Sequence, residues 1–298
     1  MADIAELSLT VGRSAIDDTL TEFCTADLGG VEPRVADAIR YSLLGGGKRL
    51  RAMLVAATYE AVGGTHDCRV LASAVEVVHA YSLIHDDLPC MDNDDVRRGR
   101  PTVHRVFGVS VAASAGLAMV PLAARCAYRG GRTLGLPPVG AANIVRELMR
   151  AAGAGGMIGG QLLDLQAEGV ALRLEELERV HRAKTGALIT AAARVGAIGA
   201  GGDAPQLAAV DRYGAAIGLA FQIMDDVLDV TSTTDELGKT AGRDAALQKS
   251  TYPALLGIEG ATQRAMALVA DATDALRDAR ILTPPLASIA QYVVARRS

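Results

Sequence analysis

The chain has 298 residues, of which 50% are hydrophobic and 21% are charged, a balance typical of a folded protein with a substantial core. Aromatic residues make up only 3% and tryptophan is absent, which disfavours a β-sandwich and a surface that stacks nucleic-acid bases. The formal net charge of −4 provides no general attraction for polyanions. We therefore expect no nucleic-acid partner, and a phosphate-bearing ligand would need a local basic cluster or metal ions.

The four cysteines are widely separated and form no C-x-x-C pair; they are Cys24, Cys68, Cys90 and Cys126. This spacing fits neither a zinc site nor a dense disulfide framework. We therefore expect free thiols in a reducing cytoplasm. The first twenty residues lack a basic flank followed by an apolar block, and we expect no signal peptide there.

In chain order, apolar residues recur every three or four positions, which is the period of amphipathic helices. The predicted helices span residues 33–44, 51–62, 70–84, 106–128, 141–152, 172–198, 206–230, 252–275 and 285–295. No strand-like alternation competes with them, and the glycine and proline pairs between them are too short to be interdomain linkers. The sequence predicts one all-α domain over residues 1–298, with about ten helices.

The segment 106–124 is an uncharged stretch of 19 residues between Arg105 and Arg125, long enough to span a bilayer. It consists mostly of Ala, Gly, Ser and Val, with Pro121 near its end. Its free energy of transfer into lipid is therefore close to neutral. We expect a buried core helix here and no membrane span.

An acidic cluster follows the helix predicted over residues 70–84, and its carboxylates are Asp86, Asp87, Asp92, Asp94 and Asp95. Clustered carboxylates relieve their repulsion by binding protons or cations, and such hard oxygen ligands suit Mg²⁺. Pro89 should turn the loop so that Asp92 returns toward Asp86. The cluster predicts a metal site, the alternative being an acidic cap at a helix end.

A second acidic cluster, Asp225, Asp226 and Asp229, lies at the end of the helix predicted over residues 206–230. Asp225 and Asp229 are four positions apart, so they share one helical face and could share a cation. Two acidic clusters that each end an apolar helix predict two facing walls of one pocket.

Several basic residues accompany these carboxylates: Lys48, Arg51, Lys184, Lys239 and Lys249. Each alone is typical of a solvated surface, but together with metal-binding carboxylates they predict a phosphate site. Lys48 and Arg51, three positions apart, should share one helical face. Two competing motifs fail, because no hydroxyl residue follows Lys48 as a P-loop needs and Arg97 replaces the glycine of an EF-hand begun at Asp92.

Five separated motifs between residues 44 and 252 occur in a recognisable order: GGGKRLR, VEVVHAYSLIHDDLPCMDNDDVRRGRPT, GGQLLDL, AKTGAL, and FQIMDDVLDV followed by LGKTAGRD. This set resembles the trans-isoprenyl diphosphate synthases, and within them the bacterial-type farnesyl and geranylgeranyl diphosphate synthases. The resemblance implies an all-α isoprenoid synthase fold around a deep central cavity. It also implies a homodimer.

The resemblance assigns roles to residues of this sequence. The implied Mg²⁺ ligands are Asp86, Asp92 and Asp225, holding about three ions when substrate is bound. Asp87, Asp226 and Asp229 would support those ligands. The implied allylic diphosphate clamp is Arg97, Lys184 and Lys239. The implied isopentenyl diphosphate clamp is Lys48, Arg51, His79 and Arg98. Further implied pocket residues are Thr185, Gln222, Asp164 and Lys249.

The implied activity is Mg²⁺-dependent head-to-tail condensation of isopentenyl diphosphate with dimethylallyl or geranyl diphosphate. Tyr81, five positions before Asp86, with Ser82 beside it, resembles the farnesyl pattern, in which a ring closes the cavity floor. We expect mainly farnesyl diphosphate. The alternatives are a geranylgeranyl diphosphate synthase and a non-catalytic partner subunit, while a terpene cyclase is disfavoured because few aromatic residues could stabilise its late cations.

The sequence departs from the usual family pattern at three positions, Ala52, Val109 and Leu117. These positions commonly carry proline, glutamate and aspartate, respectively. None of them removes a residue assigned to metal or phosphate. Val109 and Leu117 both lie in the uncharged segment 106–124.

Overall fold

The computed structural model describes residues 12–232 and 249–296, and it confirms the all-α prediction. The helices are α1 (Arg13–Asp27), α2 (Pro33–Leu43), α3 (Leu50–Ala61), α4 (Arg69–Asp86), α5 (Val103–Phe107), α6 (Val109–Thr133), α7 (Pro138–Ala152), α8 (Met157–Gln166), α9 (Leu174–His181), the π-helical turn η2 (Arg182–Gly186), α10 (Ala187–Gly199), α11 (Ala204–Thr231), α14 (Tyr252–Asp278) and α15 (Pro284–Ala295). A short antiparallel hairpin joins β1 (Val96–Arg97) to β2 (Arg100–Pro101).

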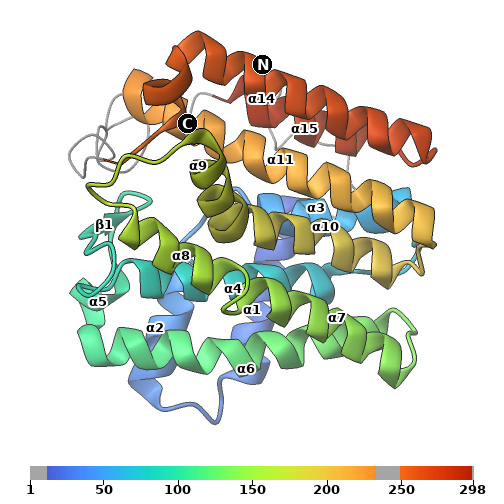
Figure 1. Ribbon diagram of the computed structural model, residues 1–298. Coiled ribbons are helices and arrows are strands. Elements are labelled where there is room, and N and C mark those ends of the chain that lie inside the picture. The colour runs from blue at the N-terminus through green and yellow to red at the C-terminus, as the bar shows by residue number, and fades with distance from the viewer. Residues whose placement is uncertain (1–11, 233–248, 297–298) are drawn as a thin grey trace.

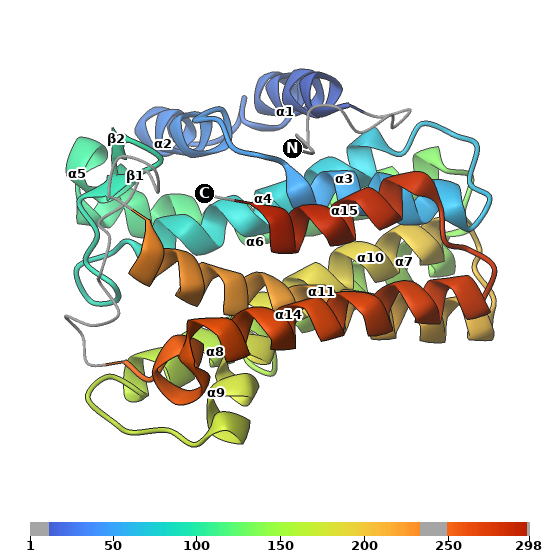
Figure 2. The ribbon, with the colours of Figure 1, turned by 90° about the horizontal axis from the view of Figure 1, so that it is seen from above.

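The helices pack in layers around α4, α10 and α11 (Figures 1 and 2). α4 packs against α6 and α3, α10 lies between α3 and α11, and α14 runs beside α11. Figure 2 shows α4 and α11 ending at the same side of the molecule, next to the hairpin. Both helices bury apolar residues along their length, so the acidic residues at their ends lie where the apolar core meets solvent.

The helix predicted over residues 172–198 is three elements, because η2 interrupts it between α9 and α10. The prediction did not include α1 or α8, nor the hairpin. α1 nevertheless buries Ile16, Leu20, Phe23 and Cys24, which have the spacing of an amphipathic helix. The signal for α1 was therefore present in the sequence.

Two glycines let neighbouring elements approach closely at the site. A Cβ atom on Gly218 of α11 would lie 2.8 Å from Cα of Gly186 in η2. A Cβ atom on Gly160 of α8 would lie 2.1 Å from the backbone nitrogen of Lys184 in the same turn. Only glycine fits these contacts, and they place η2 directly between α8 and α11.

The uncharged stretch forms most of α6, which in the described chain is long and apolar enough to cross a membrane by length and composition alone. Its Ala112, Ala115 and Met119 are fully buried, and α6 packs against α4. On another face Leu117 is 67% exposed, and only 39% of the most apolar window is buried. The expected buried core helix is thus buried on one face only.

Candidate active site

A cavity of about 330 Å³ lies where α4, α8, η2 and α11 meet. Its walls are mixed, with apolar side chains from the helices and charged side chains at their ends. The residues predicted from the sequence that line it are Arg51, His79, Ser82, Asp86, Asp92, Arg97, Asp164, Lys184, Thr185, Gln222, Asp225, Asp226 and Lys249. The structure therefore brings both acidic clusters to one cavity.

The first acidic wall is closed by the loop after α4. The Asp92 backbone N–H donates to the Asp86 carbonyl oxygen at 2.8 Å, so the loop returns as the sequence predicted. The pKa of Asp86 is raised to about 7, chiefly by burial; Lys184 opposes this rise and the Asp92 and Asp87 carboxylates add to it. Gln161 Nε2 also donates to Asp92 Oδ1 at 2.9 Å. This wall is a concentrated negative charge that a cation would stabilise.

Arg97 lines the cavity and is held by the same wall. Its Nη2 lies 2.6 Å from Asp87 Oδ1 and 2.9 Å from Asp94 Oδ2. Burial raises the pKa of Asp87 and the Arg97 guanidinium lowers it, with burial dominating. Asp87 therefore positions a cation at the cavity rim.

On the second wall, the three aspartates have different surroundings. Asp225 lines the cavity and its side chain is 32% exposed. Asp226 is buried, and its Oδ2 accepts from the Tyr252 backbone N–H at 3.0 Å and lies 3.4 Å from His181 Nε2. Asp229 is also buried. Asp225 is thus the aspartate of this wall best placed for a ligand, while Asp226 anchors the start of α14.

The basic side of the cavity is organised by Asp164. Its Oδ2 accepts from Lys184 Nζ at 2.6 Å and from Lys249 Nζ at 2.9 Å. Burial alone would raise the pKa of Asp164, but the two ammonium groups lower it to about 2. Thr185 donates to Gln222 Oε1 at 2.6 Å, which ties η2 to α11. One carboxylate thus holds two lysines from distant segments at the cavity.

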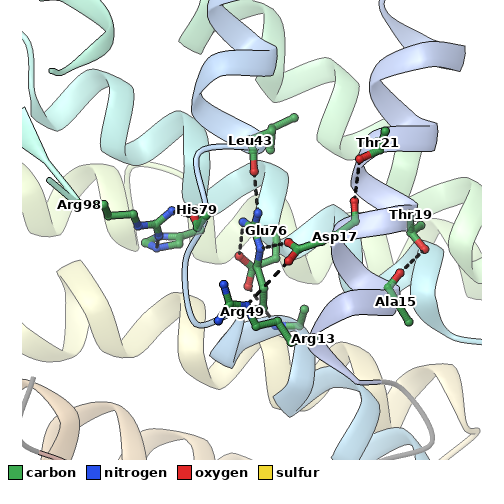
Figure 3. A network of polar contacts seen from close by, with 12 residues as sticks. Arg13, Ala15, Asp17, Thr19, Thr21, Leu43, Arg49, Glu76, His79 and Arg98 are labelled. Carbon is green, nitrogen blue, oxygen red and sulfur yellow. Dashed lines mark hydrogen bonds and ion pairs between the residues drawn. The ribbon is translucent and has the colours of Figure 1, made fainter. Parts of the chain in front are cut away.

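A second pocket of about 380 Å³ adjoins the first and contains the other predicted clamp: Lys48, Arg51, His79 and Arg98. Arg51, His79 and Phe221 line both pockets. Figure 3 shows Arg98 beside His79. Arg98 Nη2 lies 3.5 Å from His79 Nε2.

The second pocket is strongly basic. Burial, and then the nearby arginines led by Arg51, hold the pKa of His79 well below its ordinary value, so this imidazole is neutral. Arg51 Nε is buried and has no hydrogen-bond partner among the described residues. Arg49 is neutralised by Asp17 and Glu76 (Figure 3), whereas Arg51 faces the pockets. The arrangement suits an anionic ligand.

One prediction about this clamp is wrong. Lys48 does not share a helical face with Arg51, because α3 begins at Leu50 and Arg49 has a left-handed backbone with φ of 53°. Lys48 reaches the pocket from the preceding loop, and its Nζ lies 5.7 Å from the centre of the Tyr292 ring. The clamp is therefore assembled from a loop and a helix.

Tyr81 and Ser82 are placed differently. Ser82 lines the first cavity. Tyr81 is buried and is not among the lining residues; its hydroxyl donates to the Ala152 carbonyl oxygen at 3.1 Å, and its ring packs edge-on to His85. Lys239 lies outside the described residues.

The donor chemistry of the site fits Mg²⁺ held together with a diphosphate. The described residues contain no group of three His, Cys, Asp or Glu side chains close enough to hold a metal by themselves. Mg²⁺ is usually bound by one or two carboxylates, with substrate phosphates and water completing its shell. Asp86 and Asp92 on one wall, and Asp225 on the other, supply such oxygens to the same cavity.

Three residues that contact this machinery were not predicted individually: Gln161, His181 and Arg296. Gln161 stands in the GGQLLDL motif, so its position could have been inferred from the resemblance. Arg296 pairs with Asp225 at 2.7 Å, and no sequence motif marks it.

The polyprenyl synthetase family model matches residues 32–280. The chain is 47% identical over 270 residues to the farnesyl diphosphate synthase of Escherichia coli, covering 88% of this chain and 89% of that one. It is 44% identical to a chloroplastic geranylgeranyl pyrophosphate synthase of Capsicum annuum, covering 89% and 72%, respectively.

Solved structures agree with these relatives. An FPP/GFPP synthase from Zymomonas mobilis superimposes with a TM-score of 0.80 at 36% identity, covering 95% of each chain. A geranyltransferase from Helicobacter pylori, complexed with magnesium and isoprenyl diphosphate, gives a TM-score of 0.79 at 31% identity, covering 94% of each. The chain has the isoprenoid synthase fold and is a prenyltransferase. It belongs to the polyprenyl synthetase family.

Proposed function

We propose that this protein catalyses Mg²⁺-dependent head-to-tail condensation of isopentenyl diphosphate with dimethylallyl and geranyl diphosphate, with farnesyl diphosphate as the main product. One observation carries the proposal: two pockets rich in charged side chains share a wall formed by Arg51, His79 and Phe221. The first pocket is lined by carboxylates from α4, α8, α11 and the loop after α4, as well as by the lysines Lys184 and Lys249. In the second pocket, Lys48, Arg51 and Arg98 face a neutral His79. The first pocket suits a diphosphate that leaves its substrate with the help of a metal ion. The second pocket suits a diphosphate that stays attached to its substrate.

In the first pocket, Lys184, Lys249 and Arg97 would take up the charge that develops on the departing diphosphate. Bound at Asp86, Asp92 and Asp225, Mg²⁺ would add Lewis-acid stabilisation of that charge. The resemblance adds Lys239 to this clamp. Because Asp164 and Asp87 already hold the cations in place, little reorganisation accompanies the reaction.

In the second pocket, Lys48, Arg51, His79 and Arg98 would hold isopentenyl diphosphate so that its double bond points across the shared wall. The allylic cation is attacked there, a carbon–carbon bond forms, and the departed diphosphate takes the proton that is lost. Apolar lining residues such as Leu83 and Leu188 would exclude the water that would quench the cation.

We propose that the length of the product is set by the side chains of α4 that limit the depth of the first cavity. Relatives named for farnesyl and for geranylgeranyl diphosphate match the chain almost equally well, so the length rests on this chain's own residues. Tyr81, next to the lining residue Ser82 in α4, is buried and is fixed by its hydrogen bond to the Ala152 carbonyl. An immobile ring at this place favours the fifteen-carbon product, with the twenty-carbon product as the alternative.

We further propose a cytoplasmic homodimer without a nucleic-acid partner. The apolar side chains that α6 leaves exposed, Val109, Leu117 and Tyr128, support a second copy of the chain as partner. Leu117 stands where family members commonly carry aspartate, and a leucine is better suited to burial in such an interface.

The metal assignment is tested by Asp225→Ala. Because the carboxylate would be a direct ligand, we expect kcat to fall at least about a hundredfold, the effect of losing a principal electrostatic stabiliser worth about 3 kcal/mol. Asp274→Ala, on the exposed face of α14, should leave kcat unchanged. Steady-state turnover at saturating Mg²⁺ provides the measurement. Near wild-type turnover of the Asp225 variant would refute the assignment.

A further inference from the structure

Arg296 directly follows α15, and its side chain is nearly buried. It is 5% exposed, and its Nη2 lies 2.7 Å from Asp225 Oδ1. The same nitrogen donates to the Phe221 carbonyl oxygen at 2.6 Å, and the guanidinium lies 3.7 Å from the centre of the Phe221 ring. Three different interactions thus hold one cation against one turn of α11.

Burial of an arginine is costly unless its charge is balanced and its N–H groups are paired. Asp225 balances the charge, but Arg296 Nε is buried without a hydrogen-bond partner among the described residues. The guanidinium is therefore incompletely satisfied where it lies. Its position depends on the ion pair with Asp225, and losing that pair would leave it poorly compensated.

The contact also joins α15 to both pockets. Phe221 lines the first cavity and the second pocket, and Tyr292 of α15 lines the second. Asp225 faces the first cavity from the same turn of α11. A change in the charge of the Asp225 carboxylate therefore acts directly on Arg296 at the end of α15.

We propose that Arg296 is the resident counter-cation of Asp225 when no divalent ion is bound, and that divalent-ion binding at Asp225 releases the end of α15. The inference rests on the proposed role of Asp225 as a metal ligand. A divalent cation on this carboxylate would lie within a few ångströms of the guanidinium, and like charges at that separation repel strongly in a partly desolvated site. The divalent ion and the Arg296 guanidinium therefore compete for the Asp225 carboxylate.

The first experiment is a titration of the full-length protein with Mn²⁺ in the presence of inorganic pyrophosphate, with free Mn²⁺ measured by electron paramagnetic resonance. For Arg296→Gln we expect binding about three- to tenfold tighter than wild type, because a partly buried competing cation is removed. Arg296→Lys keeps the charge and should stay close to wild type. Arg277→Gln, which removes an exposed ion pair on α14, controls for the loss of one positive charge elsewhere.

The second experiment measures hydrogen exchange in residues 285–296 of the same proteins. In wild type, Mn²⁺ with pyrophosphate should accelerate exchange there, whereas in Arg296→Gln exchange should be fast already and should not change further. A thermal unfolding curve confirms that each variant is folded. Unchanged or weaker Mn²⁺ binding by folded Arg296→Gln, or no wild-type change in exchange, overturns the inference.

Asp225→Asn separates this inference from the proposed function. If that variant loses Mn²⁺ binding while Arg296→Gln binds like wild type, the metal role stands and only the counter-cation role fails. If Asp225→Asn binds Mn²⁺ like wild type, Asp225 is not a ligand, and both its proposed metal role and the counter-cation role of Arg296 fail.

Discussion

At the scale of single residues, this site is a set of charges that already have partners. Asp164 holds two lysines, and Asp87 and Asp94 hold Arg97. Side chains fixed in this way need not be ordered when substrate arrives, which lowers the entropic cost of binding. Arg51 lines both pockets, and its buried Nε has no hydrogen-bond partner among the described residues, so this N–H group is available to a ligand.

Replacement of Arg51 by Gln should raise KM for isopentenyl diphosphate about tenfold or more, since a charge-assisted hydrogen bond contributes about 1.5–3 kcal/mol. KM for geranyl diphosphate should change much less, because we propose that its diphosphate binds at Lys184, Lys249 and Arg97 instead. Initial rates measured with one substrate varied at a time give both constants. Equal increases in the two KM values would show that the basic residues are wrongly divided between the two diphosphate sites.

Motif spacing was enough to predict most of these charges, because one acidic cluster begins where an apolar helix ends and the other occupies the last turns of an apolar helix. It could not predict the pairing of Arg296 with Asp225. Nothing near Arg296 in the sequence distinguishes it from a solvated surface arginine. The contact depends on where α15 packs, which is a tertiary property.

At the scale of elements, η2 is the feature that the helical period could not predict. Residues 172–198 have a continuous apolar pattern, yet the structure inserts a π-helical turn that carries Lys184 and Thr185. Such turns are common at functional sites because they change the direction of side chains within a helix. Here the turn is held by backbone contacts with Gly160 and Gly218.

Gly160→Ala should therefore displace η2. Alanine favours a helix by about 1 kcal/mol, but its Cβ would lie 2.1 Å from the backbone of Lys184, and overpacking of this kind costs about 1–3 kcal/mol or more. We expect a lower melting temperature. We also expect kcat to fall up to about a hundredfold, because the Lys184 ammonium moves.

Gly155→Ala is the matched control, since a Cβ there meets no atom within 4 Å. It should leave both the melting temperature and kcat close to wild type. Thermal unfolding and steady-state kinetics of the two variants test the argument. A Gly160 variant as stable and active as the Gly155 variant would show that η2 adjusts freely.

At the scale of the whole molecule, the fold brings the ends of α4 and α11 together and leaves an apolar interior behind them. The facing walls could be predicted from two similar helix ends. The depth of the cavity could not, because it depends on which neighbouring helix each side chain of α4 meets. Tyr81 illustrates this: its ring packs edge-on to His85, and its hydroxyl is fixed on the end of α7.

Tyr81→Ala should lengthen the product. We expect a growing prenyl chain that fills the first cavity to run down α4 past Ser82, which lines it, toward the buried Tyr81 ring. The close-packed interior cannot make room for five more carbons without strain of about 1–3 kcal/mol. Removing the ring opens that space, so we expect a shift from fifteen-carbon toward twenty-carbon products, measured by chromatography after dephosphorylation. Tyr81→Phe keeps the ring and loses only the hydrogen bond to Ala152, and should still give the fifteen-carbon product. An unchanged distribution from an active Tyr81→Ala enzyme would mean that the floor of the cavity is formed elsewhere.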